Sequence, residues 1–403
     1  MKAGKIFSNM AFKLFIAVLA GLFAGRLADE KAISIILPLK HVLGQLIFFF
    51  VPLIVFGFVT PAVTRMKKNA SKILGISLTM AYVSSVITAI FAVFAGYTSV
   101  SFFDLQSSPV TKELPEMIFQ LDIPPLMSVM SALTLALTVG LTVVWTNAEA
   151  IENLLYRFQD IVSSMVNRIM LPILPFFVFF NFSVLSYEGT VNTEQLPFFA
   201  AFIVVTILCN ALWVAFSYLA AGIYSRKNPW RVLKHYGPVI LTALGTQSSA
   251  ASLGVAIEAA GKSDALNKDV RGFAIPFFAN IHFCGSVLNI VFLVIVISQV
   301  LYGHIPPIDT LVLFTLLLGI FAIGAPGLPG GTVVASLGLI QAVLGFDETA
   351  TAFLLSIFAL QDSFGTANNI TSDGALTLIL SSYSDRKTHV NRPNKTEHGT
   401  GKA

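Results

Sequence analysis

The stretch LQDSFGTANNITSDG, residues 360–374, lies inside a long apolar segment that runs from Ala352 to Leu380. It carries two aspartates, two asparagines and several hydroxyl side chains, whereas the whole segment contains no Lys, Arg or His. A carboxylate at the centre of a bilayer costs at least about 2.5–3.5 kcal/mol. Two carboxylates in such a segment therefore need polar or cationic partners from outside it.

Four polar residues of this stretch fall on one face of a helix. Because an α-helix turns about 100° per residue, residues 4, 7 and 11 positions after the first lie within about 60° of one another. The four are Asp362, Thr366, Asn369 and Asp373. One interpretation is that this polar stripe packs against another polar span. The interpretation we favour is that a bound cation and a substrate ammonium group supply the missing positive charge.

The composition is that of a membrane protein with many spans. Hydrophobic residues make up 55% of the 403 residues and charged residues only 11%, too few to cover a soluble globule of this size. The net charge of +4 fits Lys and Arg in cytoplasmic loops, and no pattern indicates a nucleic-acid partner or a phosphate loop. Cys209 and Cys284 indicate neither a disulfide framework nor a metal site.

Apolar segments need roughly 20 residues to cross about 30 Å of hydrocarbon. Eight segments qualify as predicted spans: 10–27, 34–62, 73–98, 117–145, 169–187, 196–224, 272–302 and 350–381. Lys and Arg mark cytoplasmic loops. Their distribution places both termini, the loop 65–72 and the loop 226–234 on the cytoplasmic side.

Two further apolar segments, 236–260 and 309–345, are interrupted by small and polar residues. Basic residues flank the first on both sides, so both of its ends are expected in the cytoplasm. Acidic residues flank the second, so both of its ends are expected outside. Each is therefore predicted to be a re-entrant hairpin, and the two enter the membrane from opposite faces.

The halves of the C-terminal region resemble each other. AASLGVAIEAAG (250–261) is similar to VASLGLIQAVLG (334–345), and CGSVLNIV (284–291) is similar to DGALTLIL (373–380). With hairpins entering from opposite sides, this pattern predicts an inverted repeat of hairpin plus span. Such repeats place a binding site near the membrane midplane in secondary transporters.

The tip TQSSAAS (246–252), the tip GLPGG (327–331) and the span LQDSFGTANNITSD (360–373) resemble the dicarboxylate/amino acid:cation symporter family, in particular its sodium-coupled serine/threonine branch. The resemblance covers residues 5–385. It implies the glutamate-transporter fold, an all-α polytopic membrane protein with eight spans and two oppositely oriented hairpins, working as a homotrimer.

The resemblance also implies a division of labour along the chain. Residues 1–235 are expected to form mostly a static scaffold, although spans three and six move with the transport region. Residues 236–383 are expected to form that mobile region, and 384–403 a disordered cytoplasmic tail.

Roles for individual residues follow from the same resemblance. Asp362 matches an aspartate that holds the substrate amino group, Thr366 lines the same pocket, and the amide of Asn369 donates to the substrate α-carboxylate. Gly365 stands where members with acidic substrates carry an arginine, so it is expected to leave uncharged space for a short side chain. Further residues expected at the substrate are Ser248, Ser249, Leu328, Pro329 and Gly330.

Sodium is the expected coupling ion. Its expected ligands are Asp373, Asn369, Asn280, His282, Ile323 and Ala325. The asparagine–methionine–aspartate–glycine motif of the family reads His282–Phe283–Cys284–Gly285 here, so Cys284 replaces a usual ligand aspartate and the number of sodium ions stays open. His282 either is hydrogen-bonded to a neighbour or takes part in proton transfer.

These features predict a secondary active symporter of a prokaryotic cytoplasmic membrane that couples inward sodium movement to uptake of serine, threonine or alanine by an elevator mechanism. The alternative is a cation- or proton-coupled symporter for dicarboxylates or other organic acids. An enzyme is not expected: an intramembrane aspartyl protease needs aspartates on facing helices, whereas Asp362 and Asp373 lie on one helix, about 16 Å apart.

Overall fold

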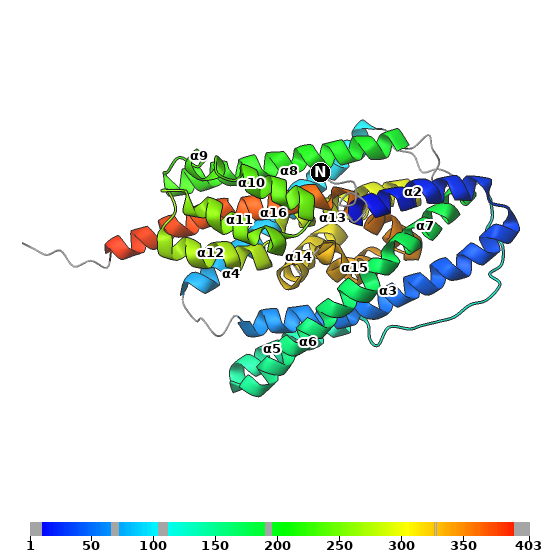
Figure 1. Cartoon of the computed structure of the whole chain (residues 1–403), viewed down its shortest axis with the longest axis horizontal. Helices are drawn as coiled ribbons and strands as arrows, with labels where there is room; N and C mark the ends of the chain where they lie inside the picture. Colours follow the sequence, from blue (N-terminus) through cyan, green and yellow to red (C-terminus); the bar gives the residue numbers. More distant parts are fainter. Residues whose placement is uncertain are drawn as a thin grey trace, which may run out of the picture.

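The computed structural model describes residues 10–65, 72–103, 112–189, 196–325, 327 and 329–390. These residues form helices and the connections between them, without a strand among them (Figure 1). The all-helical fold class predicted from the sequence is confirmed. Leu328 and the residues after Val390, which include most of the predicted tail, lie outside the described part of the chain.

One group of helices packs around α3 and α7. Its members are α2 (Met10–Leu27), α3 (Glu30–Arg65), α5 (Val129–Thr146), α6 (Glu149–Met165), the π-helical turn η1 (Val166–Met170) and α7 (Leu171–Glu188). Gly21 and Gly25 lie on the side of α2 that faces α7, where an added Cβ would collide with the α7 backbone. This small-residue spacing lets the two helices approach closely, as is typical of membrane helices.

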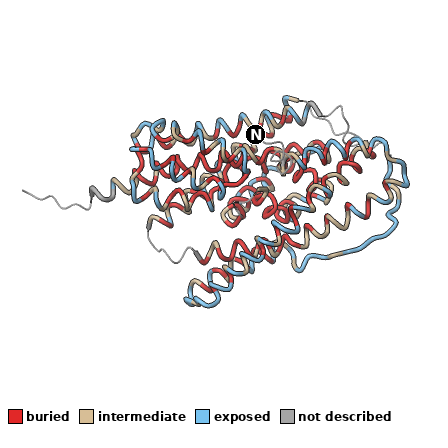
Figure 2. Tube along the Cα trace, in the orientation of Figure 1, coloured by how far each residue is buried: buried red, intermediate tan, exposed pale blue. Residues whose placement is uncertain are grey.

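A second group packs around the polar helix α16. Its members are α4 (Lys72–Phe102), α8 (Leu196–Ser225), the short α9 (Trp230–Leu233), α12 (Lys268–Ile281), α13 (Cys284–Tyr302) and α16 (Glu348–Val390). α13 contacts both α4 and α16, and every residue from Cys284 to Ser298 is buried (Figure 2). The carboxyl groups of Asp362 and Asp373 therefore lie in a protein interior and not against lipid.

Two helical hairpins complete the fold. The first consists of α10 (Gly237–Thr246) and α11 (Ser249–Gly261), and the second of α14 (Ile308–Gly324) and α15 (Gly331–Leu344). At 1.5 Å per residue, these arms are about 15, 20, 26 and 21 Å long, shorter than the roughly 30 Å of a hydrocarbon core. In Figure 1, α14 and α15 lie between the two groups, and both contact α3.

Three predicted boundaries are corrected. The span predicted at 117–145 begins only at Val129, because Pro124 and Pro125 precede the N-cap Ser128 and residues 112–128 run as an exposed, non-helical segment. The span predicted at 272–302 is broken at His282 and Phe283. The last helix continues to Val390, so the tail predicted from residue 384 starts as helix.

Six helical segments in the described residues are long and apolar enough to cross a membrane by themselves: 30–64, 73–102, 129–146, 149–188, 200–225 and 268–302. The predicted spans 10–27 and 350–381 form helices α2 and α16 but are not among these six. α16 contains the polar stripe, and its burial among α8, α10, α12 and α13 compensates for that polarity.

Candidate functional site

Asp362 lies where the tip of the second hairpin meets α16. Its side chain is only 4% exposed, and the N–H of Gly330 donates to Oδ2 at 2.7 Å. The Thr366 hydroxyl lies 3.5 Å from Oδ1. Gly330 is the N-cap of α15, with φ of 69°, so the carboxylate sits at the positive end of that helix. The predicted pair of Asp362 and Thr366 is therefore brought together with Gly330.

The tips of the two hairpins contact each other above this carboxylate. The hydroxyl of Ser248 donates to the carbonyl oxygen of Gly327 at 2.7 Å, and the N–H of Ala250 donates to the same oxygen at 3.4 Å. A cavity of about 20 Å³ remains beside Asp362 and is lined by Pro329, Gly330 and Gln247 among others. Space of this size holds about one water molecule. The hairpins are thus in a closed arrangement.

Each tip is also fixed to α16 separately. Gln247, at the left-handed turn between α10 and α11, donates through Nε2 to the Ala359 carbonyl at 3.2 Å and to the Ser363 hydroxyl at 3.1 Å. Ser248 caps α11 by accepting from the N–H of Ala251, and the neighbouring Ser249 is buried. Gln247 is a contact that the sequence analysis did not assign to the site.

Asn369 is hydrogen-bonded to the start of α13. Its Oδ1 accepts from the backbone N–H groups of Gly285 at 2.7 Å and Ser286 at 3.2 Å, and its Nδ2 donates to the Ser286 hydroxyl at 2.9 Å. These N–H groups belong to the first turn of α13, which has no intrahelical partners for them. In this arrangement Asn369 holds the break in the seventh span.

The expected open space at Gly365 is absent, which corrects that prediction. A Cβ added there would lie 2.7 Å from Nδ2 of Asn289 and 3.2 Å from the carbonyl oxygen of Gly285. The glycine is needed where α16 crosses α13, so no substrate side chain fits beside it in this conformation. The sequence could not reveal this contact because α13 approaches only in the folded protein.

The six predicted sodium ligands fall into two separate places. Asp373, Asn369 and His282 lie in the interior, where Nδ1 of His282 is 2.8 Å from Oδ1 of Asp373 and Nε2 is 2.9 Å from the hydroxyl of Ser84. Asn280, Ile323 and Ala325 instead line a cleft of about 620 Å³. Ser84, one of several hydroxyl residues in α4, was not identified from the sequence.

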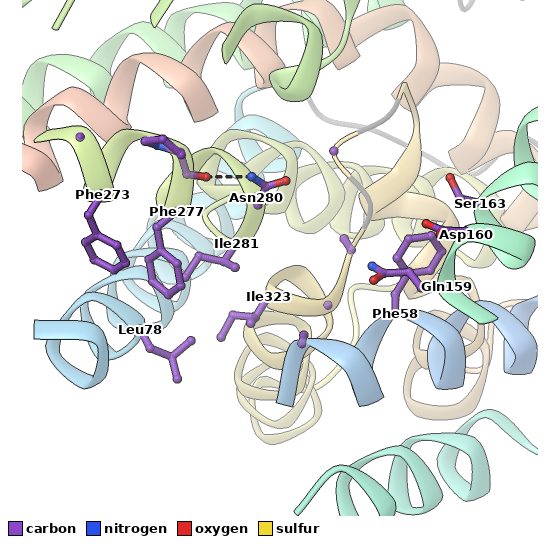
Figure 3. A pocket seen from close by; sticks show the side chains of 16 residues that line it. Phe58, Leu78, Gln159, Asp160, Ser163, Phe273, Phe277, Asn280, Ile281 and Ile323 are labelled. Carbon is purple, nitrogen blue, oxygen red and sulfur yellow. Dashed lines mark hydrogen bonds between the residues drawn. The ribbon is translucent and has the colours of Figure 1, made fainter. Parts of the chain in front are cut away.

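The cleft lies between the two groups of helices. Figure 3 shows Phe58 of α3, Gln159 and Asp160 of α6, Leu78 of α4, and Phe277 and Asn280 of α12 around it. The amide of Asn280 donates to the Pro276 carbonyl at 2.8 Å, so its side-chain nitrogen is engaged within α12. The cleft is thus an open space between the two groups of helices.

Two helices end at this cleft, and their ends suit a cation. α12 ends at Ile281 and α14 at Gly324, and the last four carbonyl groups of an α-helix lack intrahelical partners. Both ends carry the negative pole of the helix dipole. Backbone oxygens at broken helix ends are the ligands that sodium finds in secondary transporters. The group of Asn280, Ile323 and Ala325 therefore fits a sodium ion, whereas the interior group is already internally bonded.

A ladder of buried amides joins α8, α13 and α16 behind the site. Nδ2 of Asn368 donates to Oδ1 of Asn210, and Nδ2 of Asn210 donates to Oδ1 of Asn289, both at 2.8 Å. Nδ2 of Asn289 donates to the Gln361 carbonyl at 3.3 Å. The asparagines within apolar spans were the sequence signal for this ladder, which ties three helices of the second group together.

Paired helical hairpins whose tips meet over a buried carboxylate, beside broken helices, are features of a secondary transporter. The family model described as the sodium:dicarboxylate symporter family matches residues 10–383. The chain belongs to this family of membrane transport proteins.

Three curated proteins illustrate the similarity. A putative sodium-dependent excitatory amino acid transporter, glt-4, of Caenorhabditis elegans is 27% identical over 180 residues, covering 45% of this chain and 33% of that protein. The neutral amino acid transporter B(0) of Bos taurus is 26% identical over 171 residues, covering 42% and 31%. The human protein of that name is 26% identical over 166 residues, covering 41% and 30%. The matches thus span about a third of each relative.

Proposed function

We propose that this protein is a symporter that couples inward sodium movement to the uptake of a small neutral amino acid, with serine, threonine and alanine as the favoured substrates. The observation that carries the proposal is the position of Asp362, a buried carboxylate under the contact of the two hairpin tips. An ammonium group in place of the Gly330 N–H would satisfy this carboxylate by a charge-assisted hydrogen bond.

The absence of a cationic partner favours a neutral substrate. Among the described residues, neither the partners of Asp362 nor the lining of the small cavity beside it include Arg or Lys. A second carboxylate on the substrate would therefore be buried without a counter-charge, at a cost of several kcal/mol. Two of the relatives are neutral amino acid transporters by name, which agrees with this preference.

The elevator mechanism, the homotrimer and the location in a prokaryotic cytoplasmic membrane with cytoplasmic termini are parts of the same proposal. The cleft between the helix groups supports such a movement, because it gives one body open space in which to shift against the other. The amide ladder supports a rigid transport region. Residues 236–383 would move with α4 and α8, and the rest of 1–235 would form the scaffold.

Uptake into proteoliposomes tests the proposal. Serine, threonine, alanine, aspartate and succinate are offered one at a time under an inward sodium gradient or an inward proton gradient. We expect accumulation of a neutral amino acid that requires sodium, and its loss in Asp362→Asn but not in the control Asp309→Asn at the exposed start of α14.

The alternative substrate class is a dicarboxylate, which the family description names. Accumulation of succinate or aspartate, with no uptake of neutral amino acids, would replace the proposed substrate by this alternative. Accumulation that follows the proton gradient alone would remove the sodium coupling. Light scattering of the purified protein, with the detergent contribution subtracted, tests the homotrimer separately.

A further inference from the structure

The interior group of predicted sodium ligands is already occupied by protein contacts. His282 lies at the break between α12 and α13, and its side chain is fully buried between α4 and α16. One ring nitrogen faces Oδ1 of Asp373 at 2.8 Å, and the other faces the hydroxyl of Ser84 at 2.9 Å. The imidazole thus bridges three elements, and neither nitrogen is left for a ligand.

The direction of the hydrogen bonds follows from the groups themselves. An ionised carboxylate only accepts, so Nδ1 of His282 carries the proton that joins it to Asp373. Ser84 can donate to Nε2 or accept from it, so the bridge is complete in either form of the ring. The imidazole N–H therefore takes up one of the acceptor positions of Oδ1 that a cation would use.

The remaining neighbours do not complete a shell for a hard cation. Oδ1 of Asn369 already accepts two backbone N–H groups, and the thiol of Cys284 points to Oδ1 of Asn368 at 3.7 Å. Oδ2 of Asp373 has no hydrogen-bond partner in the described residues, which leaves one vacant carboxylate oxygen. Hard cations are held by several oxygen ligands, whereas at this position His282 offers ring nitrogens and Cys284 a sulfur.

We propose that Asp373 is a structural partner of His282 and not a sodium ligand, so that this chain binds sodium only at the helix ends that line the cleft. The inference rests on the sodium coupling of the proposed function and assigns sodium binding to one place in the fold. It also changes the chemistry of the interior site, where a side chain of the protein replaces a mobile ion.

The test counts sodium ions without transport. The melting temperature of the purified, substrate-free protein is measured as sodium chloride replaces choline chloride at constant ionic strength. The slope of stabilisation against the logarithm of sodium concentration reports how many ions the native state binds. We expect the same slope in Asp373→Asn as in the wild type, even where the melting temperature is lower.

The variant Asp362→Asn is the matched control, because it removes another buried carboxylate from α16 and shows what that loss does to the melting temperature by itself. A slope reduced by one whole ion in Asp373→Asn would overturn the inference. A wild-type protein whose melting does not respond to sodium would support the inference about Asp373 but count against the proposed sodium coupling.

A measurement on the wild type keeps the test open if Asp373→Asn does not fold. The protein is labelled with ¹⁵N-histidine, and the His282 signals are assigned by their absence in His282→Gln. We expect the Nδ1 shift of His282 to stay the same when sodium replaces choline, because its partner Asp373 does not bind the ion. The inference would be refuted if the Nδ1 shift changed with sodium and its midpoint lay at the same sodium concentration as the midpoint of thermal stabilisation.

Discussion

The contact at Gly365 gives the sharpest test of the folded arrangement. In Gly365→Ala, the new Cβ would lie 2.7 Å from Nδ2 of Asn289, so that amide must move. Overpacking of this kind costs about 1–3 kcal/mol. Moving Asn289 also weakens its hydrogen bonds to Asn210 and to the Gln361 carbonyl, at about 1 kcal/mol for each bond lost. We expect a destabilisation of about 3–5 kcal/mol from these two effects.

The control for this variant is Gly254→Ala in α11, where nothing lies within 4 Å of the added Cβ. Both changes gain about 1 kcal/mol of helix propensity, so the difference between the two variants isolates the contact with α13. The assay is thermal unfolding of the two purified variants in the same detergent. If Gly365→Ala melts at or above Gly254→Ala, α16 and α13 do not cross at this glycine.

The same contact decides what an arginine would do at this position. The first carbon of the Arg side chain in Gly365→Arg meets the same atoms of Asn289 and Gly285. We therefore expect this variant to yield little folded protein, and not to switch the substrate preference toward aspartate. A well-folded Gly365→Arg protein that takes up aspartate would show that α16 and α13 separate here during transport.

Three further predictions concern the tips, the carboxylate and the topology. Ser248→Ala removes the bond to Gly327 and the cap of α11, so we expect about 1–2 kcal/mol less stability, measured as a lower melting temperature than that of Ser249→Ala. Asp362→Asn should need at least tenfold more substrate for the same rise in melting temperature, because an amide pairs poorly with an ammonium group. An unchanged dose response would exclude Asp362 from substrate binding. After replacement of Cys209 and Cys284, an impermeant thiol reagent should reach a cysteine at the exposed Asp264 from the cytoplasm and one at Asp309 from outside; labelling of both from one side would contradict opposed hairpins.

The helix content and the two hairpins followed from the sequence because they depend on local properties. The length of the apolar segments predicted the spans, and the small and polar residues at 244–254 and 323–331 predicted the interruptions. The structure places these interruptions at the turns between α10 and α11 and between α14 and α15. The break at His282 was missed because the residues around it, from Phe277 to Val287, are mostly as apolar as the helices on either side.

The site was only partly accessible to sequence reasoning. The common face of Asp362, Thr366, Asn369 and Asp373 follows from helical spacing alone, and all four side chains are buried. Their partners were not accessible, because Asp373 meets His282 across 91 positions of the chain and Asp362 meets Gly330 across 32. Such pairs depend on how helices pack, which spacing within one helix does not specify.

The single carbonyl of Gly327, which accepts from Ser248 and Ala250, bears on how the two entrances of the protein are kept from opening together. Withdrawal of either tip breaks both bonds, at about 1 kcal/mol each, so the second tip then opens roughly 30-fold more easily. Taken alone, this cooperativity favours a continuous pore through which ions would run down their gradients. Alternation in the proposed mechanism therefore depends on α16, which holds the first tip through Gln247 and the second through Asp362 by bonds that the tips do not share.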